Sequence, residues 1–432
     1  MIKPVLVVGG GIAGIQAALD LADQGIKVYL VERSPSIGGR MAQLDKTFPT
    51  LDCAACILTP KMVSVARHPN IELLTYTEVK EISGKAGDFK VKIVKKPRYV
   101  NVDKCTGCGV CMEKCPSKKI PNEFNMGLNN RTAIYIPFPQ AVPLKATIDP
   151  EHCLYFKSIR EGKKGACRVC ERFCPAKAID FEQKPEEVEL NVASIIFATG
   201  FELEDPRKRE EYGYGKYANV YTHLEFERLL SATGPTEGEI VRRSDGKHPK
   251  RIAFIQCVCS RDILTNPYCS AICCMASTKE AILAKEHMPE VECIVFYMDL
   301  RAFGKGYQEF YERAQKEFGI KYIRSRPAKI EEDPETKNLI ITYEDTVTSE
   351  YKKMEVDMVV LAVGVKPLSL EKFFPVEDDR FAKKENPFLD PVASPIEGIY
   401  VIGMLGGPKD IPDSVTEASA AAMKAAIWAA RG

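Results

Sequence analysis

Eight cysteines in two runs are the residues whose types and spacing most clearly predict chemistry. The first run has the pattern Cys-x2-Cys-x2-Cys-x3-Cys-Pro; the second has a single cysteine, then thirteen residues, then Cys-x2-Cys-x3-Cys-Pro. Three thiolates on one short loop can converge on one iron–sulfur cube, and the proline turns the chain away. The spacing favours two [4Fe–4S] clusters over zinc sites or structural disulfides. The eight residues are Cys105, Cys108, Cys111, Cys115, Cys153, Cys167, Cys170 and Cys174.

The first run resembles the bacterial ferredoxin pattern, in which the fourth cysteine of each run binds the other cluster. The second run departs from that pattern, and we expect residues 154–166 to form a loop inserted between ligands. The resemblance implies two ligand sets, which are Cys105, Cys108, Cys111 and Cys174 for one cluster and Cys153, Cys167, Cys170 and Cys115 for the other.

Four further cysteines surround the start of a predicted helix, and they are Cys257, Cys269, Cys273 and Cys274. A buried strand over residues 250–256 precedes them and a helix over 275–287 follows. In thioredoxin-reductase-like proteins this strand leads into a glycine loop, but no G-x-G-x-x-G is present here. Four thiolates beside a helix N-terminus predict a third [4Fe–4S] cluster. Cys259 competes for one ligand position, and a redox disulfide (Cys257 with Cys259, or Cys269 with Cys273) is the alternative.

Three other cysteines have less certain roles. The pair Cys53 and Cys56 suits a redox disulfide against the flavin, as in disulfide reductases, or a cluster completed by another chain, and the sequence does not separate these alternatives. Cys293 occupies one position in the alternating pattern of a predicted strand and is expected to be a buried core thiol. The five histidines show no ligand spacing.

The N-terminal segment carries a dinucleotide-binding fingerprint. A strand over residues 3–8 leads into Gly9-x-Gly11-x-x-Gly14 and a helix, and a second strand over 27–32 ends at Glu32. The three glycines allow a tight turn, close approach of a pyrophosphate, and helix–strand packing, while the acid binds ribose hydroxyls. Strand, loop, helix, strand and acid together predict a bound dinucleotide.

The flanking segments favour FAD over NAD. Gly38-Gly39-Arg40 resembles a loop of two-dinucleotide-binding flavoproteins, as do residues 192–201 and 398–404. Ser414 and Glu417 predict a capping box, so the last helix should begin near Ser414. Met404 stands where that superfamily usually has aspartate. The expected FAD-binding residues are Gly9, Gly11, Ile12, Ala13, Gly14, Glu32, Arg33, Gly39, Arg40, Val79, Ala198, Thr199, Gly200, Gly403, Lys409, Asp410 and Ser414.

Two strand segments, 88–96 and 186–200, are expected to belong to one β-meander that the first cysteine runs interrupt. The predicted fold class is therefore α/β, a thioredoxin-reductase-like flavoprotein of two dinucleotide-binding domains with an inserted two-cluster ferredoxin domain. The expected division is an FAD-binding domain in three parts (1–97, 185–246 and 367–432), the insert (98–184), and a second Rossmann-like domain with cluster-binding cysteines (247–366).

Composition limits the functional classes. The chain has 432 residues, of which 45% are hydrophobic and 28% charged, with 60 basic and 59 acidic side chains. This balance gives no bulk field to attract nucleic acid. No apolar stretch reaches about 18 residues, and no cleavage-site pattern follows the N-terminus. Sixteen cysteines in metal-type spacing imply a reducing compartment, so a cytoplasmic location is expected.

Four segments (48–63, 122–143, 256–274 and 406–422) together resemble the A subunits of heterodisulfide reductase over essentially the whole chain. The chain is expected to be a short form without that family's extra N-terminal domain and C-terminal ferredoxin domain. The family usually has glycine at Cys259, which argues against that residue as a ligand. Lys409 is expected to hydrogen-bond near the flavin N5 or to stabilise the anionic flavin; a solvated loop lysine is the alternative.

The resemblance implies a component of anaerobic metabolism whose flavin splits or joins electron pairs (bifurcation or confurcation). Implied partners are B and C subunits that carry the disulfide chemistry, ferredoxin, and a hydrogenase, formate dehydrogenase or NADH-oxidising donor, with a homodimer inside the larger complex. The implied cofactors are FAD and three [4Fe–4S] clusters, or four if Cys53 and Cys56 contribute. The alternative functions are a flavoprotein of a quinone-interacting membrane-bound oxidoreductase and a stand-alone disulfide reductase using Cys53 and Cys56.

Overall fold

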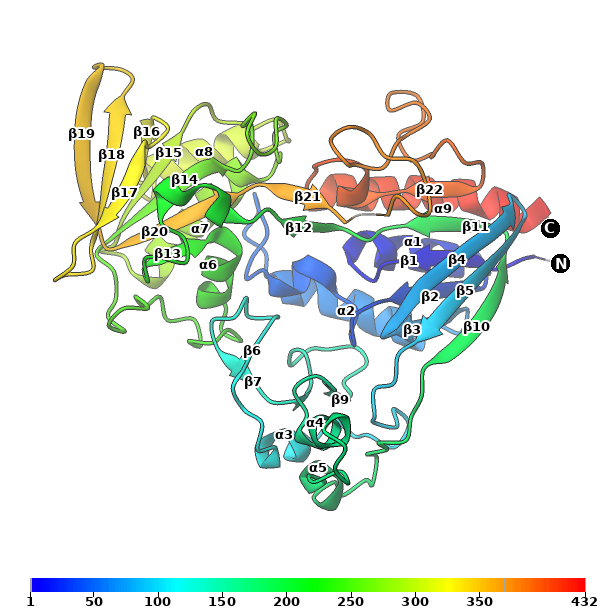
Figure 1. Ribbon diagram of the computed structural model, residues 1–432. Coiled ribbons are helices and arrows are strands. Elements are labelled where there is room, and N and C mark those ends of the chain that lie inside the picture. The colour runs from blue at the N-terminus through cyan, green and yellow to red at the C-terminus, as the bar shows by residue number, and fades with distance from the viewer. Residues whose placement is uncertain (1, 369, 432) are drawn as a thin grey trace.

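The computed structural model describes residues 2–368 and 370–431, and a parallel sheet near the two termini forms its first unit (Figure 1). The strand order is β22-β11-β1-β2-β3. Every residue of β1 is buried, so both faces of the sheet are covered, as its unbroken VLVV run predicts. The strands are β1 (Val5–Val8), β2 (Val28–Glu32), β3 (Ile71–Thr75), β11 (Ser194–Phe197) and β22 (Ile399–Val401), and the helices α1 (Ile12–Asp23), α2 (Ala54–Arg67) and α9 (Ile411–Arg431).

A second parallel sheet has the order β13-β20-β14-β15-β16 and forms the other unit. Its central strand, β14, is buried along nearly its whole length. The expected strand and helix around the second cysteine group are thus confirmed. The strands are β13 (Val220–Thr222), β14 (Arg251–Val258), β15 (Glu292–Tyr297), β16 (Lys321–Arg324) and β20 (Met358–Val363), and the helices α6 (His223–Leu230), α7 (Cys273–His287) and α8 (Tyr307–Lys316).

Antiparallel strands accompany both units. The sheet β10-β5-β4 covers the first unit, and Lys95 at the end of β5 faces Glu186 at the start of β10, which confirms the expected pairing for residues 186–192. The later part of the expected segment, residues 194–197, instead forms β11 of the parallel sheet. The short pair β12 and β21 runs between the two units in Figure 1. These strands are β4 (Thr77–Lys85), β5 (Asp88–Lys95), β10 (Glu186–Val192), β12 (Phe201–Leu203), β21 (Val365–Pro367), β17 (Lys329–Glu332), β18 (Leu339–Asp345) and β19 (Glu350–Val356).

Residues 96–185, which include the expected insert 98–184 and are called the insert from here on, project from the ends of β5 and β10 toward the bottom of Figure 1. The insert contacts both units. Val142 donates its N–H to Ser36 Oγ at 2.8 Å in the first unit, and Asn125 Oδ1 accepts from Arg228 Nε at 3.0 Å in the second. Its elements are short: α3 (Val110–Lys114), β6 (Ile120–Pro121), β7 (Asn130–Arg131), β8 (Ile134–Tyr135), β9 (Thr147–Ile148), α4 (Leu154–Arg160) and α5 (Val169–Arg172).

Two local expectations are wrong. The last helix begins at Ile411 rather than near Ser414, because Asp410 Oδ1 accepts the Asp413 N–H at 3.0 Å and caps the helix one turn earlier. Glu417 is therefore not part of a capping box; it accepts the Gly403 N–H at 2.9 Å. Residues 154–166 are not wholly a loop either, because α4 occupies the first half of that segment.

Candidate functional site: a flavin cavity with three thiol sets

A cavity of about 820 Å³ lies where the first unit, the second unit and the insert meet. It is lined by the loop after β1, the end of β2, η1 (Gly39–Gln43), the loop after β11 and the start of α9. Every residue that the sequence suggests for FAD, apart from Gly14, lines this one cavity. The fold therefore brings together residues that are up to about four hundred positions apart.

The three fingerprint glycines differ in what they permit. A Cβ on Gly9 would lie 2.4 Å from the Ala198 carbonyl oxygen, and one on Gly14 would lie 1.8 Å from the Gly9 carbonyl oxygen. Both positions therefore serve close packing of the chain. A Cβ on Gly11 would meet no protein atom within 4 Å. Because Gly11 lines the cavity and caps the N-terminus of α1, its open side fits a pyrophosphate.

The acid at the end of β2 holds the glycine loop. Glu32 Oε2 accepts the Gly10 N–H at 2.7 Å, and Oε1 accepts the Ser34 N–H at 2.8 Å. Each carboxylate oxygen keeps a second lone pair for a hydroxyl. Thr199 Oγ1, which belongs to another lining residue of the cavity, is buried and has no hydrogen-bond partner among the described residues. An open glycine, an acid with spare acceptor capacity and an orphaned hydroxyl fit a dinucleotide such as FAD.

Two basic residues and one strand segment form the outer wall. The Arg33 guanidinium lies 3.5 Å from a Glu202 carboxylate oxygen, and Arg40 Nη1 donates to Gln43 Oε1 at 2.9 Å. Burial lowers the pKa of Arg40. The pairing of β4 with β5 shifts register at Val79, which interrupts the ladder beside the cavity. This interruption fits the expected backbone contact of Val79 with adenine.

The loop between β22 and α9 brings a lysine into the cavity. Lys409 Nζ donates to the carbonyl oxygens of Gly403 at 2.7 Å and Gly407 at 2.8 Å, and lies 3.3 Å from Glu417 Oε2. Burial lowers the pKa of Lys409. Asp410 accepts a hydrogen bond from Tyr307 of the second unit. Lys409 is therefore a partly buried cation whose ammonium group is fixed by these contacts, rather than a solvated loop lysine.

Sequence reasoning missed the insert's contribution to the cavity. Phe124 and Phe138 line the cavity and stack on each other with ring centroids 4.6 Å apart. Asn122 and Tyr135 line it too, and the Arg228 guanidinium lies 4.8 Å from the Phe124 ring centroid. The aromatic residues of segment 122–143 were the sequence signal for this contribution. The local pattern does not show that these side chains face the flavin cavity.

The cysteines of the insert gather into two sets. Burial, together with the nearby thiols of Cys105, Cys108 and Cys174, raises the pKa of Cys111 to about 12. The remaining four thiols line one small cavity, and they are Cys115, Cys153, Cys167 and Cys170. This grouping matches the crossed pattern that the ferredoxin resemblance implies, in which each run gives its fourth cysteine to the other set.

A third set lies at the start of α7. Cys257 lies near the end of β14, Cys273 and Cys274 form the first turn of the helix, and Cys269 lies on the loop between them. Burial and then the thiols of Cys257, Cys274 and Cys269 raise the pKa of Cys273. Cys259 lies elsewhere: after burial, the groups that shift its pKa are Glu204, Arg209, Lys208 and Asp262. Its Sγ faces the Asp205 carbonyl oxygen at 3.7 Å.

Within the part of the chain that the structure describes, no three Cys, His, Asp or Glu side chains are grouped tightly enough for one metal ion. A single zinc ion draws each thiolate sulfur to about 2.3 Å from one centre. In a four-iron cube each thiolate binds a different iron, so the sulfurs stand farther apart.

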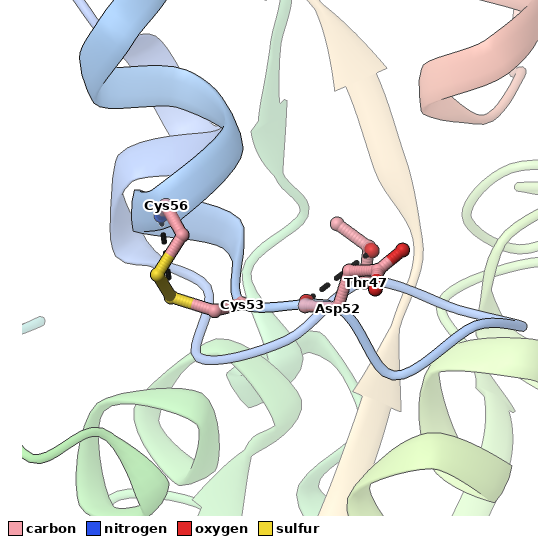
Figure 2. Close-up of a disulfide and its surroundings, with 4 residues drawn as sticks. All are labelled: Thr47, Asp52, Cys53 and Cys56. Carbon is pink, nitrogen blue, oxygen red and sulfur yellow. Dashed lines mark hydrogen bonds between the residues drawn. A yellow bond between two sulfur atoms is a disulfide. The ribbon is translucent and has the colours of Figure 1, made fainter.

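Cys53 and Cys56 form a disulfide at the N-terminus of α2 (Figure 2). Cys53 Sγ also accepts the Cys56 N–H at 3.2 Å and caps the helix. Both cysteines are exposed and neither lines the flavin cavity. The structure thus does not place this pair against the flavin site. Cys293 is buried in the second core, as expected.

Comparison with known proteins agrees with the cavity and the thiol sets. The family described as FAD dependent oxidoreductase matches residues 4–51, and that described as 4Fe-4S binding domain matches residues 98–118. Thioredoxin reductases share the fold: the Lactococcus lactis enzyme has a TM-score of 0.55 at 16% identity and covers 100% of both chains. The T. acidophilum enzyme has a TM-score of 0.54 at 14% identity, covering 98% of each. The expected fold class is confirmed.

The protein is therefore an iron–sulfur flavoprotein of the FAD-dependent oxidoreductase class. More narrowly, the chain belongs with the A subunits of heterodisulfide reductase. It is 54% identical to the iron–sulfur A subunit of CoB–CoM heterodisulfide reductase of Methanocaldococcus jannaschii, over 100% of this chain and 65% of the relative. It is 56% identical to a protein of that name, numbered 2, from Methanopyrus kandleri, over 99% of this chain and 64% of the relative.

A third relative is the A subunit of H(2):CoB-CoM heterodisulfide,ferredoxin reductase from Methanothermobacter thermautotrophicus, 52% identical over 99% of this chain and 64% of the relative. The chain thus spans less than two thirds of the length of these relatives, 64% to 65%. In residues 2–368 and 370–431, every helix is too short or too polar to cross a membrane.

Proposed function

We propose that this chain is the FAD-containing electron-transfer subunit of a heterodisulfide-reductase-like complex. The observation that carries the proposal is the thiol set at the start of α7, which occupies the place of a second nucleotide loop and adjoins the flavin cavity. Ile272 and Ala276, beside Cys273 and one turn further on, line that cavity. Electrons from a cluster there can reach FAD without a bound nicotinamide.

The proposed cofactors are one FAD and three [4Fe–4S] clusters. Their ligands are the two crossed sets of the insert and the set of Cys257, Cys269, Cys273 and Cys274. Cys259 is not a ligand in this proposal, because its thiol lies among charged side chains instead. Cys53 and Cys56 serve as a fourth, partner-completed site or as a surface redox pair; their exposure suits both roles.

Lys409 is proposed to influence the charge state of the bound flavin. It lines the cavity at the start of α9, and its two carbonyl contacts fix the ammonium group there. A fixed cation beside the ring favours an anionic reduced flavin. Gly9, Gly11, Glu32, Arg33, Arg40 and Val79 are proposed to hold the adenine half, with Ala198, Thr199, Gly200, Gly403, Asp410 and Ser414 toward the flavin.

The flavin is proposed to divide an electron pair, with one electron passing to ferredoxin and the other to B and C subunits that reduce a disulfide. The name of one relative, H(2):CoB-CoM heterodisulfide,ferredoxin reductase, joins heterodisulfide and ferredoxin in one activity, which supports this division. The donor is proposed to be a hydrogenase, a formate dehydrogenase or an NADH-oxidising partner. We further propose a cytoplasmic homodimer within the complex, and the domain boundaries given above.

Iron and flavin content test this proposal directly. Anaerobically purified protein should hold one FAD and about twelve irons, as three four-iron clusters. Cys269→Ser should lower the count to about eight irons. The matched variant Cys259→Ser should keep all of the iron, because this thiol lies outside the set. Full iron in Cys269→Ser, measured together with its electron paramagnetic resonance spectrum, would remove the third cluster from the proposal.

A further inference from the structure

Helix α7 carries a buried acid to the flavin cavity. Lys279 and Glu280 line the cavity about two turns after the thiols of Cys273 and Cys274. The Glu280 side chain is completely buried, and neither of its carboxyl oxygens has a hydrogen-bond partner among the described residues. The flavin fingerprint and the cysteine pattern do not use this residue, so its presence needs its own explanation.

The neighbours of Glu280 form a compact charged group. Glu227 of α6, which is 1% exposed, forms an ion pair with Lys279, which is 2% exposed. Glu227 Oε2 also accepts the Asp45 N–H at 3.1 Å, and Lys279 Nζ donates to the Lys46 carbonyl oxygen at 2.9 Å. The Glu280 carboxyl group lies beside that of Glu227, to which it can donate a hydrogen bond when it is protonated.

Two carboxyl groups therefore lie near one ammonium group in a buried place, and of the two only Glu227 forms an ion pair with it. Two acceptors can hydrogen-bond only if one of them carries a proton, and an unpaired buried carboxylate is costly. Glu227 already holds the ammonium and a backbone N–H, so Glu280 carries the proton. Burial and the charge of Glu227 both raise the pKa of Glu280 well above its usual range, against the pull of Lys279.

Other titratable groups face this cluster from the surrounding elements. The Cys273 thiol on α7 feels the charge of Glu280, and the charges of Glu227 and Lys279 act on Asp45 and on His223. Burial lowers the pKa of His223 to about 4, so this imidazole is neutral near pH 7. Lys279 is thus the cation that acts on Glu280.

We propose that Glu280 is the proton reservoir of the flavin cavity. This inference rests on the proposed binding of FAD there. When an external donor delivers an electron pair to the bound flavin, the O–H bond of Glu280 breaks and its proton bonds to a ring nitrogen of the flavin. Glu280 is left as a carboxylate beside Lys279. When the electron pair leaves, the proton returns to the Glu280 carboxylate, so no proton crosses to solvent.

Internal proton exchange has a measurable signature. If one proton per electron pair came from solvent, the flavin midpoint potential would fall by about 30 mV per pH unit, since a tenfold change for a two-electron couple is 29.6 mV. If Glu280 supplies the proton, the potential is independent of pH near neutrality. A flat potential is therefore expected for the wild-type chain.

The test is a mediated potentiometric titration of the FAD absorbance in the anaerobically purified full chain at several pH values near neutrality. Glu280→Gln, which keeps the shape but holds no exchangeable acid proton, should restore a slope of about 30 mV per pH unit. Glu286→Gln on the same helix, where the carboxylate forms a half-exposed pair with Lys46, should keep the flat potential. A wild-type slope of about 30 mV per pH unit overturns the proposal.

Infrared spectroscopy gives a second readout that does not depend on the variant's potential. The reduced-minus-oxidised difference spectrum should show loss of a protonated carboxyl C=O band in the wild type, and this loss should be absent in Glu280→Gln. An unchanged carboxyl band in the wild type also overturns the proposal. Absence of FAD from the purified chain would instead reject the proposed function, so the two failures are distinguishable.

Discussion

At the scale of single residues, Gly11 separates ligand binding from folding. Its backbone has φ −77° and ψ −177°, a conformation open to any residue, and its added Cβ meets only the cavity. Gly9 and Gly14 lack this property, since substitutions there collide with backbone carbonyl groups.

We predict that Gly11→Val folds but loses FAD affinity by tenfold or more, equivalent to at least about 1.4 kcal/mol, because the side chain fills the pyrophosphate position. The cluster signals in electron paramagnetic resonance should persist. Gln24→Val, at the exposed far end of α1, is the control and should keep its flavin. Stoichiometric FAD in purified Gly11→Val would show that the fingerprint loop is not the pyrophosphate site.

His223 gives a prediction about stability and pH. The buried ring accepts the Val363 N–H at Nδ1, 3.1 Å away, and burial lowers its pKa from 6.5 to about 4. Because the folded state binds this proton less tightly than the unfolded state, its contribution is complete above about pH 6.5 and is lost as pH falls toward 4. Between pH 7 and 5.5 the loss is about 1 kcal/mol.

The measurement is the thermal unfolding midpoint of the anaerobic protein at the two pH values. His223→Gln should show a smaller drop between them than the wild type. His248→Gln, at a side chain that is 58% exposed, should leave the drop unchanged. Equal drops in all three proteins would mean that protonation of His223 does not cause the loss of stability between the two pH values.

At the scale of elements, the β14–α7 connection decides what the second unit can bind. Cys257 and Cys259 both adopt positive φ, at 60° and 57°, in the segment where a glycine turn would receive a pyrophosphate. Cysteine side chains stand there instead, and a proposed cluster of net negative charge repels phosphate.

We therefore predict that neither NADH nor NADPH rapidly reduces the flavin of the isolated chain. Anaerobic stopped-flow mixing, followed at the flavin absorbance, is the measurement. Dithionite, which needs no nucleotide site, is the positive control for a reducible flavin. Fast bleaching at micromolar nucleotide would contradict the prediction and restore the second unit as a nicotinamide site.

Local patterns predicted the elements better than their contacts. The fingerprint and the cysteine runs are contiguous, so their strands, helices and glycine turn could be read directly. The start of α9 was misplaced because Asp410-x-x-Asp413 and Ser414-x-x-Glu417 are competing caps, and Pro412 suits the first turn of the earlier helix. The proximity of Glu280 to Glu227 and the position of Phe124 in the cavity wall depend on tertiary packing. A short stretch of sequence does not encode such long-range contacts.

At the scale of the whole molecule, the insert has two roles: it carries the proposed cluster ligands, and it forms part of the wall of the flavin cavity. Lys95 and Glu186 face each other across β5 and β10, so a two-residue Asn-Gly turn could close the hairpin in place of residues 96–185. The same excision would remove Phe124 and Phe138 from the cavity.

We predict that the excised chain keeps its two parallel sheets but binds FAD at least about tenfold more weakly. Circular dichroism and flavin fluorescence are the measurements. Cys170→Ser is the control, because it removes a proposed cluster ligand of the insert while leaving the aromatic wall in place. Unchanged FAD affinity after excision would mean that the wall contributes nothing to binding.

The contacts of the insert with both units also hold the two units in one arrangement relative to each other. Two short strands alone would let the units swivel, but Leu128 of the insert packs into the second core while Val142 pairs with Ile37 of the first. Arg228 is held from two sides, by Asn125 and by the Gln43 carbonyl oxygen. Because these contacts hold the units at three points, we expect the units not to reorient between turnovers. The chain's electron transfers should therefore be indifferent to solvent viscosity, in contrast to enzymes paced by domain motions of microseconds to milliseconds.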